Sequence, residues 1–560
     1  MSDHGKYVVL TDSLSDPVIE SDLFSEEIVT EYLKYQRDPV IGTQTGRVKF
    51  SDEGSYWAMH SSLPIDISIA KTPSDPPIDW LTVDERESQG NALWKYSAGY
   101  LPTFYEVSQD YSAVVMILDS LWAYTKTKDW AVRSEWMTSL DHALATRIRS
   151  LATLLFLFQE AEVEVPASLV ALVRSDAANL VRGRESFFPA NNHGAMAAVS
   201  LIHAAVIFPN VREDLLKLGA EDPLDVGIAE LDEVLASIFN DSGLAAENSP
   251  EYQRFWITLL EPVSRFFDLF GEPSSSFTQA GDHLEELLVK AREVFHQFLD
   301  GAGRMIPIGD THPRYISGFT TPVEFKGVYE DLGFAIYKTA ETTLTFNCGS
   351  TNYAHKHCDD TSITLGFKGE NIILDSGYYS HDWNDPKAIF TKSQNAHSGL
   401  FVRALDNLHP GKVHFPGRER VRARMKSLSH EDWDVVGTVT VDDTIQLERR
   451  IQARNDRAFD ILDRVEGDGS DFGGVVARYI LPQGREVSVG DNSLWIDLEH
   501  FALEVTFIGQ QRNQIQFVSS QLEPHLKGWI SPELNQLEPA VCVEVPFDGI
   551  STLQTQLRIL

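Results

Sequence analysis

The periodicity of the apolar residues changes near residue 305, and this change constrains the fold more than any other feature of the chain. From about residue 91 to 300, apolar residues recur every three or four positions, which is typical of packed helices. Residues 282–299 show the pattern clearly, and we expect Asp282 to cap this helix and Gly301 to end it. Beyond residue 305 apolar and polar residues alternate, which indicates strands. We therefore expect a multidomain α+β protein.

Some segments of the helical part are apolar on almost every side. Residues 137–158 and 194–208 are the clearest examples. A helix of this kind is buried between other helices, because its apolar surface is unfavourable in water. Repeated buried helix pairs suit an α/α toroid or a large bundle. We assign this domain to residues 91–304, after a segment of mixed character at residues 1–90.

The C-terminal part, residues 305–560, contains many short segments with strand-like alternation. Residues 435–441 and 444–451 flank Asp442 and Asp443, which is typical of a hairpin with a short turn. Further strand-like segments are 458–465, 474–481, 493–498, 502–507 and 540–545. This number of short strands predicts a large antiparallel β-sandwich.

Charge, cysteine content and hydrophobicity exclude several classes of protein. The formal net charge is −35, so we expect no binding of nucleic acid. Three cysteines make no disulfide framework, and the apolar runs are too short to span a membrane. Because no basic segment followed by an apolar run opens the chain, we expect a cytoplasmic protein, with export by another route left open. The sequence also leaves a homo-oligomer open.

A group of polar residues stands directly before the apolar segment 195–208. Asn191, Asn192 and His193 lie where a helix is expected to begin, so they can be simple caps. They can also project into a cleft, where the helix dipole favours an anion. Further along, Tyr252 is either a core residue or a phenol that donates a proton.

A second group of polar residues contains two alternating histidines. His355 and His357 would point to one face if they lie on a strand. Zinc needs three or four ligands, and Asp375 and His397 are the best additional candidates. The alternative is a hydrogen-bonded histidine network without metal, in which neighbouring aspartates orient the rings.

Together, these groups suit β-elimination from a sugar uronate. That reaction needs groups that neutralise the carboxylate, a base that takes the adjacent proton and an acid that protonates the leaving oxygen. An amide, two histidines and a tyrosine can supply these functions.

The chain resembles the heparinase II/III-like and alginate-lyase polysaccharide lyases over about residues 90–470. The segments that carry the resemblance are Trp94-Lys95-Tyr96, Asp141-His142-Ala143 through Arg147, Asn191-Asn192-His193-Gly194, Ser249-Pro250-Glu251-Tyr252, Pro307-Ile308-Gly309-Asp310, His355-Lys356-His357-Cys358-Asp359, Leu374-Asp375-Ser376-Gly377 and Asn395-Ala396-His397. The resemblance implies an α/α toroid joined to a C-terminal antiparallel β-sandwich. Lys356 and Cys358 stand where small residues are common in the family, and Ser97 stands where many relatives have Asn.

The resemblance also implies a role for each residue. Asn192 and His193 would neutralise the uronate carboxylate, Tyr252 would be the acid, and His355 would be a second proton-transfer or neutralising group. Whether Tyr252 is also the base is left open. The implied substrate contacts are Asn191, His142, Arg147 and Glu247. The implied ligands of a structural zinc are His357, Asp375 and His397, and no organic cofactor is implied.

We therefore interpret the chain as a lyase that acts on an anionic oligo- or polysaccharide containing uronic acid. One alternative is a glycoside hydrolase on a similar toroid, which needs two carboxylates at a set separation. Glu247 and Asp310 are the pair we would propose for that reaction. The other alternative is a noncatalytic glycan-binding protein.

Overall fold

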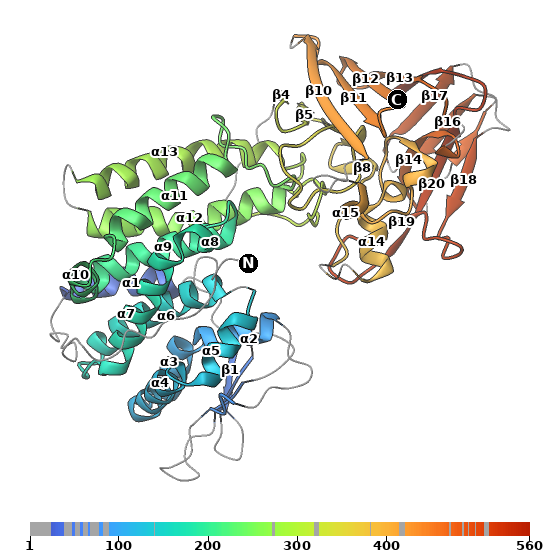
Figure 1. Ribbon diagram of the computed structural model, residues 1–560. Helices are drawn as coiled ribbons and strands as arrows, with labels where there is room; N and C mark the ends of the chain where they lie inside the picture. The colour runs from blue at the N-terminus through green and yellow to red at the C-terminus, as the bar shows by residue number, and fades with distance from the viewer. Residues whose placement is uncertain are drawn as a thin grey trace. The chain divides into compact units, whose positions relative to one another are not determined.

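The chain forms two compact units in the computed structural model (Figure 1). The structure describes residues 24–37, 47–50, 56–59, 65–67, 78–81 and 89–560, apart from 139, 272–274, 318–323, 381, 383, 414–419, 430, 470–471, 484–486, 491, 499 and 509–514. The first unit comprises Met1–Phe239 and Trp256–Leu288, and the second comprises Asn240–Phe255 and Val289–Leu560. Much of the expected segment 1–90 lies outside the described residues.

The first unit is helical, apart from a small antiparallel sheet of β1 (Arg47–Phe50), β2 (Tyr56–Met59) and β3 (Ile65–Ile67) among its described residues. Its helices are α1 (Glu26–Arg37), α2 (Gln89–Ser97), α3 (Leu101–Ser108), α4 (Tyr111–Thr125), α5 (Lys128–Trp136), α6 (Leu140–Glu160), α7 (Ala167–Arg182), α8 (Arg184–Phe187), α9 (Asn192–Ile207), α10 (Pro209–Lys217) and α11 (Pro223–Ile238). Two further helices, α12 (Pro250–Phe270) and α13 (Ser276–Gln297), have residues in both units.

The helices α6 and α9 lie at the centre of the first unit, as their composition predicted. Both are buried along nearly their whole length, and α9 packs against α6 and α11. Removing a large apolar side chain from water contributes about 1.5–3 kcal/mol, so these helices are stable only inside the unit. Among the described residues, no single helix is long and apolar enough to cross a bilayer; α9 and α10 meet the criterion only together, across a 100° bend.

The expected start of α13 was wrong by six residues. We expected Asp282 to cap this helix, but α13 begins at Ser276 and Asp282 lies inside it. The side chain of Ser275 accepts a hydrogen bond from the backbone N–H of Thr278 at 3.1 Å, so Ser275 takes the capping role. The earlier start buries Phe277, whose ring centroid lies 4.5 Å from that of Phe267.

The second unit is built mainly from three antiparallel sheets. An eight-stranded sheet has the order β10 (Val421–Ser429), β11 (Asp434–Val441), β12 (Ile445–Asn455), β13 (Ala458–Glu466), β21 (Thr552–Ile559), β17 (Ala502–Ile508), β16 (Ser493–Asp497) and β15 (Val487–Val489). A second sheet has the order β18 (Gln516–Ser519), β20 (Glu538–Pro546), β14 (Val475–Pro482) and β9 (Leu400–Val402), with β19 (Trp529–Ile530) beside β20. A third has the order β4 (Phe325–Tyr329), β5 (Phe334–Lys338), β6 (Thr342–Asn347), β7 (Ser362–Phe367) and β8 (Glu370–Ile373).

The register of β11 and β12 confirms the predicted hairpin. Val441 pairs with Ile445, and the turn places Asp442 and Asp443 at φ 46° and 57°, a conformation that aspartate tolerates better than most residues. Buried side chains from all three sheets form one core, which includes Phe346 and Val439. The five other segments that we predicted as strands correspond to β13, β14, β16, β17 and β20.

The segment 240–255 packs with the second unit, although we had placed it within residues 91–304. Leu244 and Ala246 belong to the same buried cluster as Val294, Ile308 and Phe334. This packing matters for function, because the same segment carries Glu247 and Tyr252 into the β-rich unit.

Candidate active site

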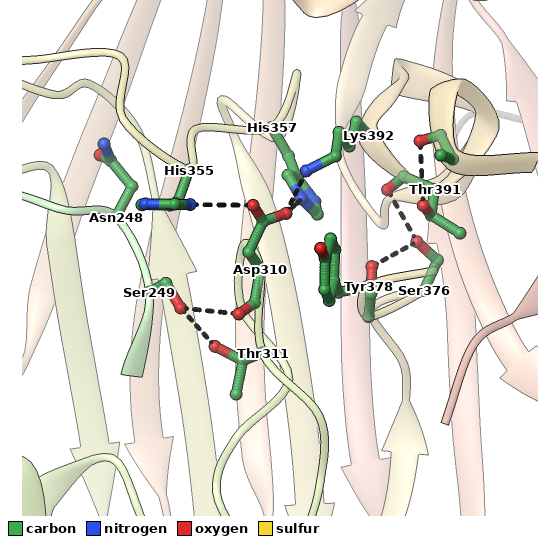
Figure 2. A network of polar contacts seen from close by, with 12 residues as sticks. Asn248, Ser249, Asp310, Thr311, His355, His357, Ser376, Tyr378, Thr391 and Lys392 are labelled. Carbon is green, nitrogen blue, oxygen red and sulfur yellow. Dashed lines mark hydrogen bonds and ion pairs between the residues drawn. The ribbon is translucent and has the colours of Figure 1, made fainter. Parts of the chain in front are cut away.

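Three loops of the second unit bring polar side chains together in one cluster. The first loop runs from Glu247 into the start of α12, the second contains Asp310, and the third lies between β6 and β7 and contains His355 (Figure 2). The backbones of these loops are tied to one another. Asn248 donates from its side-chain amide to the backbone oxygens of Asn352 at 3.1 Å and Ala354 at 2.9 Å.

The phenol of Tyr252 stacks on the imidazole of His355. The two ring centroids are 3.3 Å apart and the ring planes differ by 17°. Burial, together with the negative charges of Asp310 and Glu247, raises the pKa of Tyr252 well above its ordinary value. Tyr252 is therefore a protonated phenol at neutral pH, which suits a proton donor.

His355 lies between two carboxylates. Its Nδ1 is 3.0 Å from Oδ2 of Asp310, and its Nε2 is 3.1 Å from Oε2 of Glu247. Burial by itself would lower the pKa of His355, but the hydrogen bonds to Asp310 and Glu247 outweigh it, and the pKa rises. Its side chain is 22% exposed, so a substrate can reach it.

The condition under which His355 and His357 would point to one face, a strand at these residues, is not met. Both residues are in the loop before β7, and His355 has φ 54°, in the left-handed region. Their imidazoles nevertheless come near each other, because both bond the carboxylate of Asp310. Tertiary contacts, rather than strand alternation, bring the two side chains together.

The three residues predicted as metal ligands form a buried cluster. His357, Asp375 and His397 each offer an atom within 4.8 Å of the others. Nε2 of His357 bonds Asp310 at 2.9 Å, and Nδ1 of His397 bonds Asp375 at 2.8 Å. The opposite nitrogens, Nδ1 of His357 and Nε2 of His397, are buried without a hydrogen-bond partner. Two imidazoles fixed by carboxylates, each with a free nitrogen, fit the surroundings of a metal ion.

A buried lysine, Lys356, stands beside this cluster. Lys356 forms ion pairs with Asp359 and Asp360, and all three side chains are buried. Burial would lower the pKa of Lys356, but the two carboxylates raise it well above its ordinary value. The ammonium therefore compensates two buried negative charges that would otherwise be unfavourable.

In the first unit, the predicted polar residues gather around the start of α9. The side chain of Asn191 caps the helix and accepts from the backbone N–H of His193 at 2.8 Å. Nδ1 of His193 is 3.6 Å from Asp141, and its ring centroid is 4.7 Å from that of His142. Trp94 lies edge-on to His142. Asn192 is the first residue of the helix and is partly exposed.

Two predicted substrate contacts need correction. Arg147 is fully buried: its guanidinium pairs with Asp176 and donates to the backbone oxygen of Tyr96 at 2.9 Å, so it stabilises the helical unit instead. Glu247 is only 4% exposed and faces His355, so we place it beside that imidazole rather than against a sugar. Ser97 is also buried.

The structure adds two residues that the sequence did not single out in these roles. Lys392, in α14 (Pro386–Lys392), pairs with Asp310, and its ammonium lies 4.8 Å from the ring centroid of Tyr378. Asp310 itself accepts from two histidines, so it has no freedom to act as one of two hydrolytic carboxylates with Glu247. No local pattern marks Lys392, because a helix-terminal lysine is usually exposed.

Comparisons with known proteins agree with this architecture. Residues 326–552 match the family model of the heparinase II/III-like C-terminal domain. Residues 326–552 are therefore similar to the C-terminal domain of the heparinase II/III-like family, and the part of the predicted resemblance that concerns this family is confirmed. No curated protein matches the sequence.

Solved structures of heparinases share the fold of the whole chain. A heparinase III with methylated lysines is similar with a TM-score of 0.65 at 13% identity, over 98% of this chain and 87% of that one. Heparan sulfate lyase HepC from Pedobacter heparinus is similar with a TM-score of 0.60 at 15% identity, over 97% and 84%. The predicted fold class, an α/α toroid followed by an antiparallel β-sandwich, is confirmed.

Proposed function

We propose that this protein is a polysaccharide lyase that cleaves uronic-acid-containing glycans by β-elimination. The observation that carries the proposal is the stacked pair of Tyr252 and His355, with His355 held between Glu247 and Asp310. The pair provides a phenol that stays protonated next to groups that can hold a second proton. The heparinase-like fold supports the same class of reaction.

In the proposed reaction, the proton on C5 of the uronate moves to the His355–Glu247 pair through His355, the member of the pair that a substrate can reach. The electrons of the C5–H bond form a double bond between C4 and C5, and the bond from C4 to O4 breaks. Tyr252 gives its proton to O4, so the leaving sugar departs as an alcohol. The product carries a 4,5-unsaturated uronate at its new non-reducing end, and no co-reactant is needed. Neutralisation of the uronate carboxylate by Asn192 and His193, at the start of α9 in the first unit, stays a prediction from the motif resemblance.

We further propose that His357, Asp375 and His397 hold a zinc ion. Two imidazoles and a carboxylate suit zinc, and water can complete its coordination. Burial lowers the pKa of His357, which keeps this imidazole neutral as ligation requires. When bound, the ion would cross-link the loops that carry these three residues, which is a structural role.

The product of the reaction distinguishes the proposal from its alternatives. The purified protein is incubated with alginate, hyaluronan, heparan sulfate and oligouronides, and the ultraviolet absorbance of the conjugated product is followed. We expect absorbance to rise with at least one substrate. New reducing ends without that absorbance would indicate a glycoside hydrolase, and binding without cleavage would indicate a noncatalytic protein.

A further inference from the structure

The carboxylate of Asp310 contacts both parts of the site in the second unit. Its Oδ2 accepts from Nδ1 of His355 at 3.0 Å, and its Oδ1 accepts from Nε2 of His357 at 2.9 Å. Lys392 also donates to Oδ1, and Figure 2 shows Asp310 between His355 on one side and His357 and Lys392 on the other. Asp310 is 3% exposed, so water hardly competes with these partners for its oxygens.

The backbone around Asp310 leaves the carboxylate little freedom to move. The hydroxyl of Ser249 donates to the backbone oxygen of Asp310 at 3.1 Å and lies 2.7 Å from the hydroxyl of Thr311. Gly309 has φ 55°, and a Cβ there would lie 2.3 Å from the backbone oxygen of Asn248. Only glycine fits this close approach without strain. The loop therefore presents the carboxylate in one position.

Each histidine that bonds Asp310 has a different second neighbour. His355 stacks on Tyr252, where the proposed proton transfers occur. Nδ1 of His357 has no hydrogen-bond partner, and the ring centroid of His397 lies 5.4 Å from that of His357. A carboxylate that bonds the far nitrogen of a ligating histidine fixes its tautomer and ring orientation. Asp310 thus fixes the ring of His357 from outside the metal cluster, and the same carboxylate orients His355.

We propose that Asp310 is a positioning residue shared by the catalytic His355 and the metal-binding His357. Its replacement disturbs turnover and metal affinity together, although it contacts neither the sugar nor the ion. The part of this inference that concerns turnover rests on the proposed function. The part that concerns the metal rests on the geometry of the histidines alone.

The test compares Asp310→Asn with His355→Ala and with a matched control. Asparagine keeps the shape of aspartate but has only one acceptor oxygen for three donors. The control is Asp434→Asn, which also loses a buried carboxylate of the second unit, where the partner is Arg450 on β12. If the single variant does not fold, the double variant Asp310→Asn with Lys392→Met replaces it in the test. The second substitution removes the buried ammonium that Asp310→Asn leaves without its carboxylate.

Zinc affinity is measured by competition with a chromogenic chelator, and kcat and KM are measured at saturating zinc on the best substrate of the panel. For Asp310→Asn we expect zinc affinity to fall about 10–100-fold and kcat to fall about 100-fold with KM little changed. For His355→Ala we expect a fall in kcat only. For Asp434→Asn we expect neither quantity to change.

Two results would overturn the inference: unchanged zinc affinity in Asp310→Asn, or kcat restored to the wild-type value at saturating zinc. If the wild-type protein cleaves no substrate, the proposed function fails, and crystal structures of the zinc-soaked proteins decide the inference instead. A His355 ring displaced from Tyr252 in Asp310→Asn would support it. An unmoved ring would contradict it.

Discussion

Tyr252 is the residue whose replacement tests the proposed chemistry most directly. We expect Tyr252→Phe to lower kcat about 10²–10⁴-fold, because a general acid contributes a factor of this size. The melting temperature should change little, since the ring and its stack on His355 remain. The matched control is Tyr315→Phe in the same unit, where the side chain is 71% exposed and outside the site. A folded Tyr252→Phe protein with wild-type kcat would show that the proton comes from another group.

Asn192 and His193 carry the proposed contact with the uronate carboxylate. Replacing either with Ala should lower kcat/KM about 10²–10³-fold, the usual effect of losing one donor to a developing negative charge. Neither side chain caps the helix, so the melting temperature should stay nearly constant. His283→Ala is a suitable control, because the side chain of His283 is 74% exposed in the same unit. Loss of stability with full activity would assign these residues to the fold.

His357 tests whether the histidine cluster holds a metal. Protein purified without chelator should contain about one zinc per chain, and chelation should lower its melting temperature, because the ion binds only the folded state. His357→Ala should lose the zinc and the stabilisation together. The control His525→Ala changes an exposed histidine and should keep both the zinc and the stabilisation. A metal-free protein whose stability chelators do not affect would leave a hydrogen-bonded network.

At the scale of single elements, the cap of α9 is expected to affect the stability of the protein. The side chain of Asn191 accepts from the backbone N–H groups of His193 and Gly194. Asn191→Ala should therefore lower the free energy of unfolding by about 0.5–2 kcal/mol, whereas Asn191→Asp should retain most of it. Urea unfolding of the two variants measures the difference. Equal stability of Asn191→Ala and wild type would show that water replaces the cap.

The strands of the second unit follow from local sequence more closely than the loops between them. The alternation at 435–441 and 444–451 predicted β11 and β12, because one face of each strand packs on the core. The same reasoning failed at His355 and His357, which alternate in a loop. Two polar residues separated by one position do not specify a strand unless apolar neighbours provide a buried face.

At the scale of the whole molecule, a buried ionic network in the sandwich predicts a dependence of stability on pH. Glu544 contacts Arg478, Arg403 and Lys527. Burial would raise the pKa of Glu544, but the charge of Arg478 and the hydrogen bond from Lys527 outweigh it and lower the pKa to about 2. The ordinary value is 4.5. Because the folded pKa is the lower one, this stabilisation is fully present above pH 4.5 and is lost as the pH falls toward 2.

We therefore expect Glu544→Gln to be less stable than wild type at neutral pH, by on the order of 1–3 kcal/mol. The difference should shrink as the pH is lowered below about 4.5, since wild-type Glu544 then loses its own charge. Urea unfolding at several pH values measures the gap. A gap that stays constant with pH would show that the ionised carboxylate is not its origin.

The sequence by itself determined the type of the apolar helices and of the alternating strands, and it marked most of the residues that could carry chemistry. Both depend on local information: apolar periodicity selects helix or strand, and polar residues in apolar surroundings stand out as candidates. The order of the motifs predicted the family resemblance, and the resemblance implied the three proposed metal ligands, which the structure brings within 4.8 Å of one another.

Only the tertiary structure decided which of these residues meet. The carboxylate of Asp310 accepts hydrogen bonds from His355, His357 and Lys392, which lie 45, 47 and 82 positions away along the chain. Arg147 was predicted to bind substrate but is neutralised by Asp176, which lies 29 positions along the chain. A buried charge is unfavourable unless an opposite charge or a hydrogen bond compensates it. The compensating group comes from a segment that packing brings near, and local sequence patterns do not indicate which segment that is.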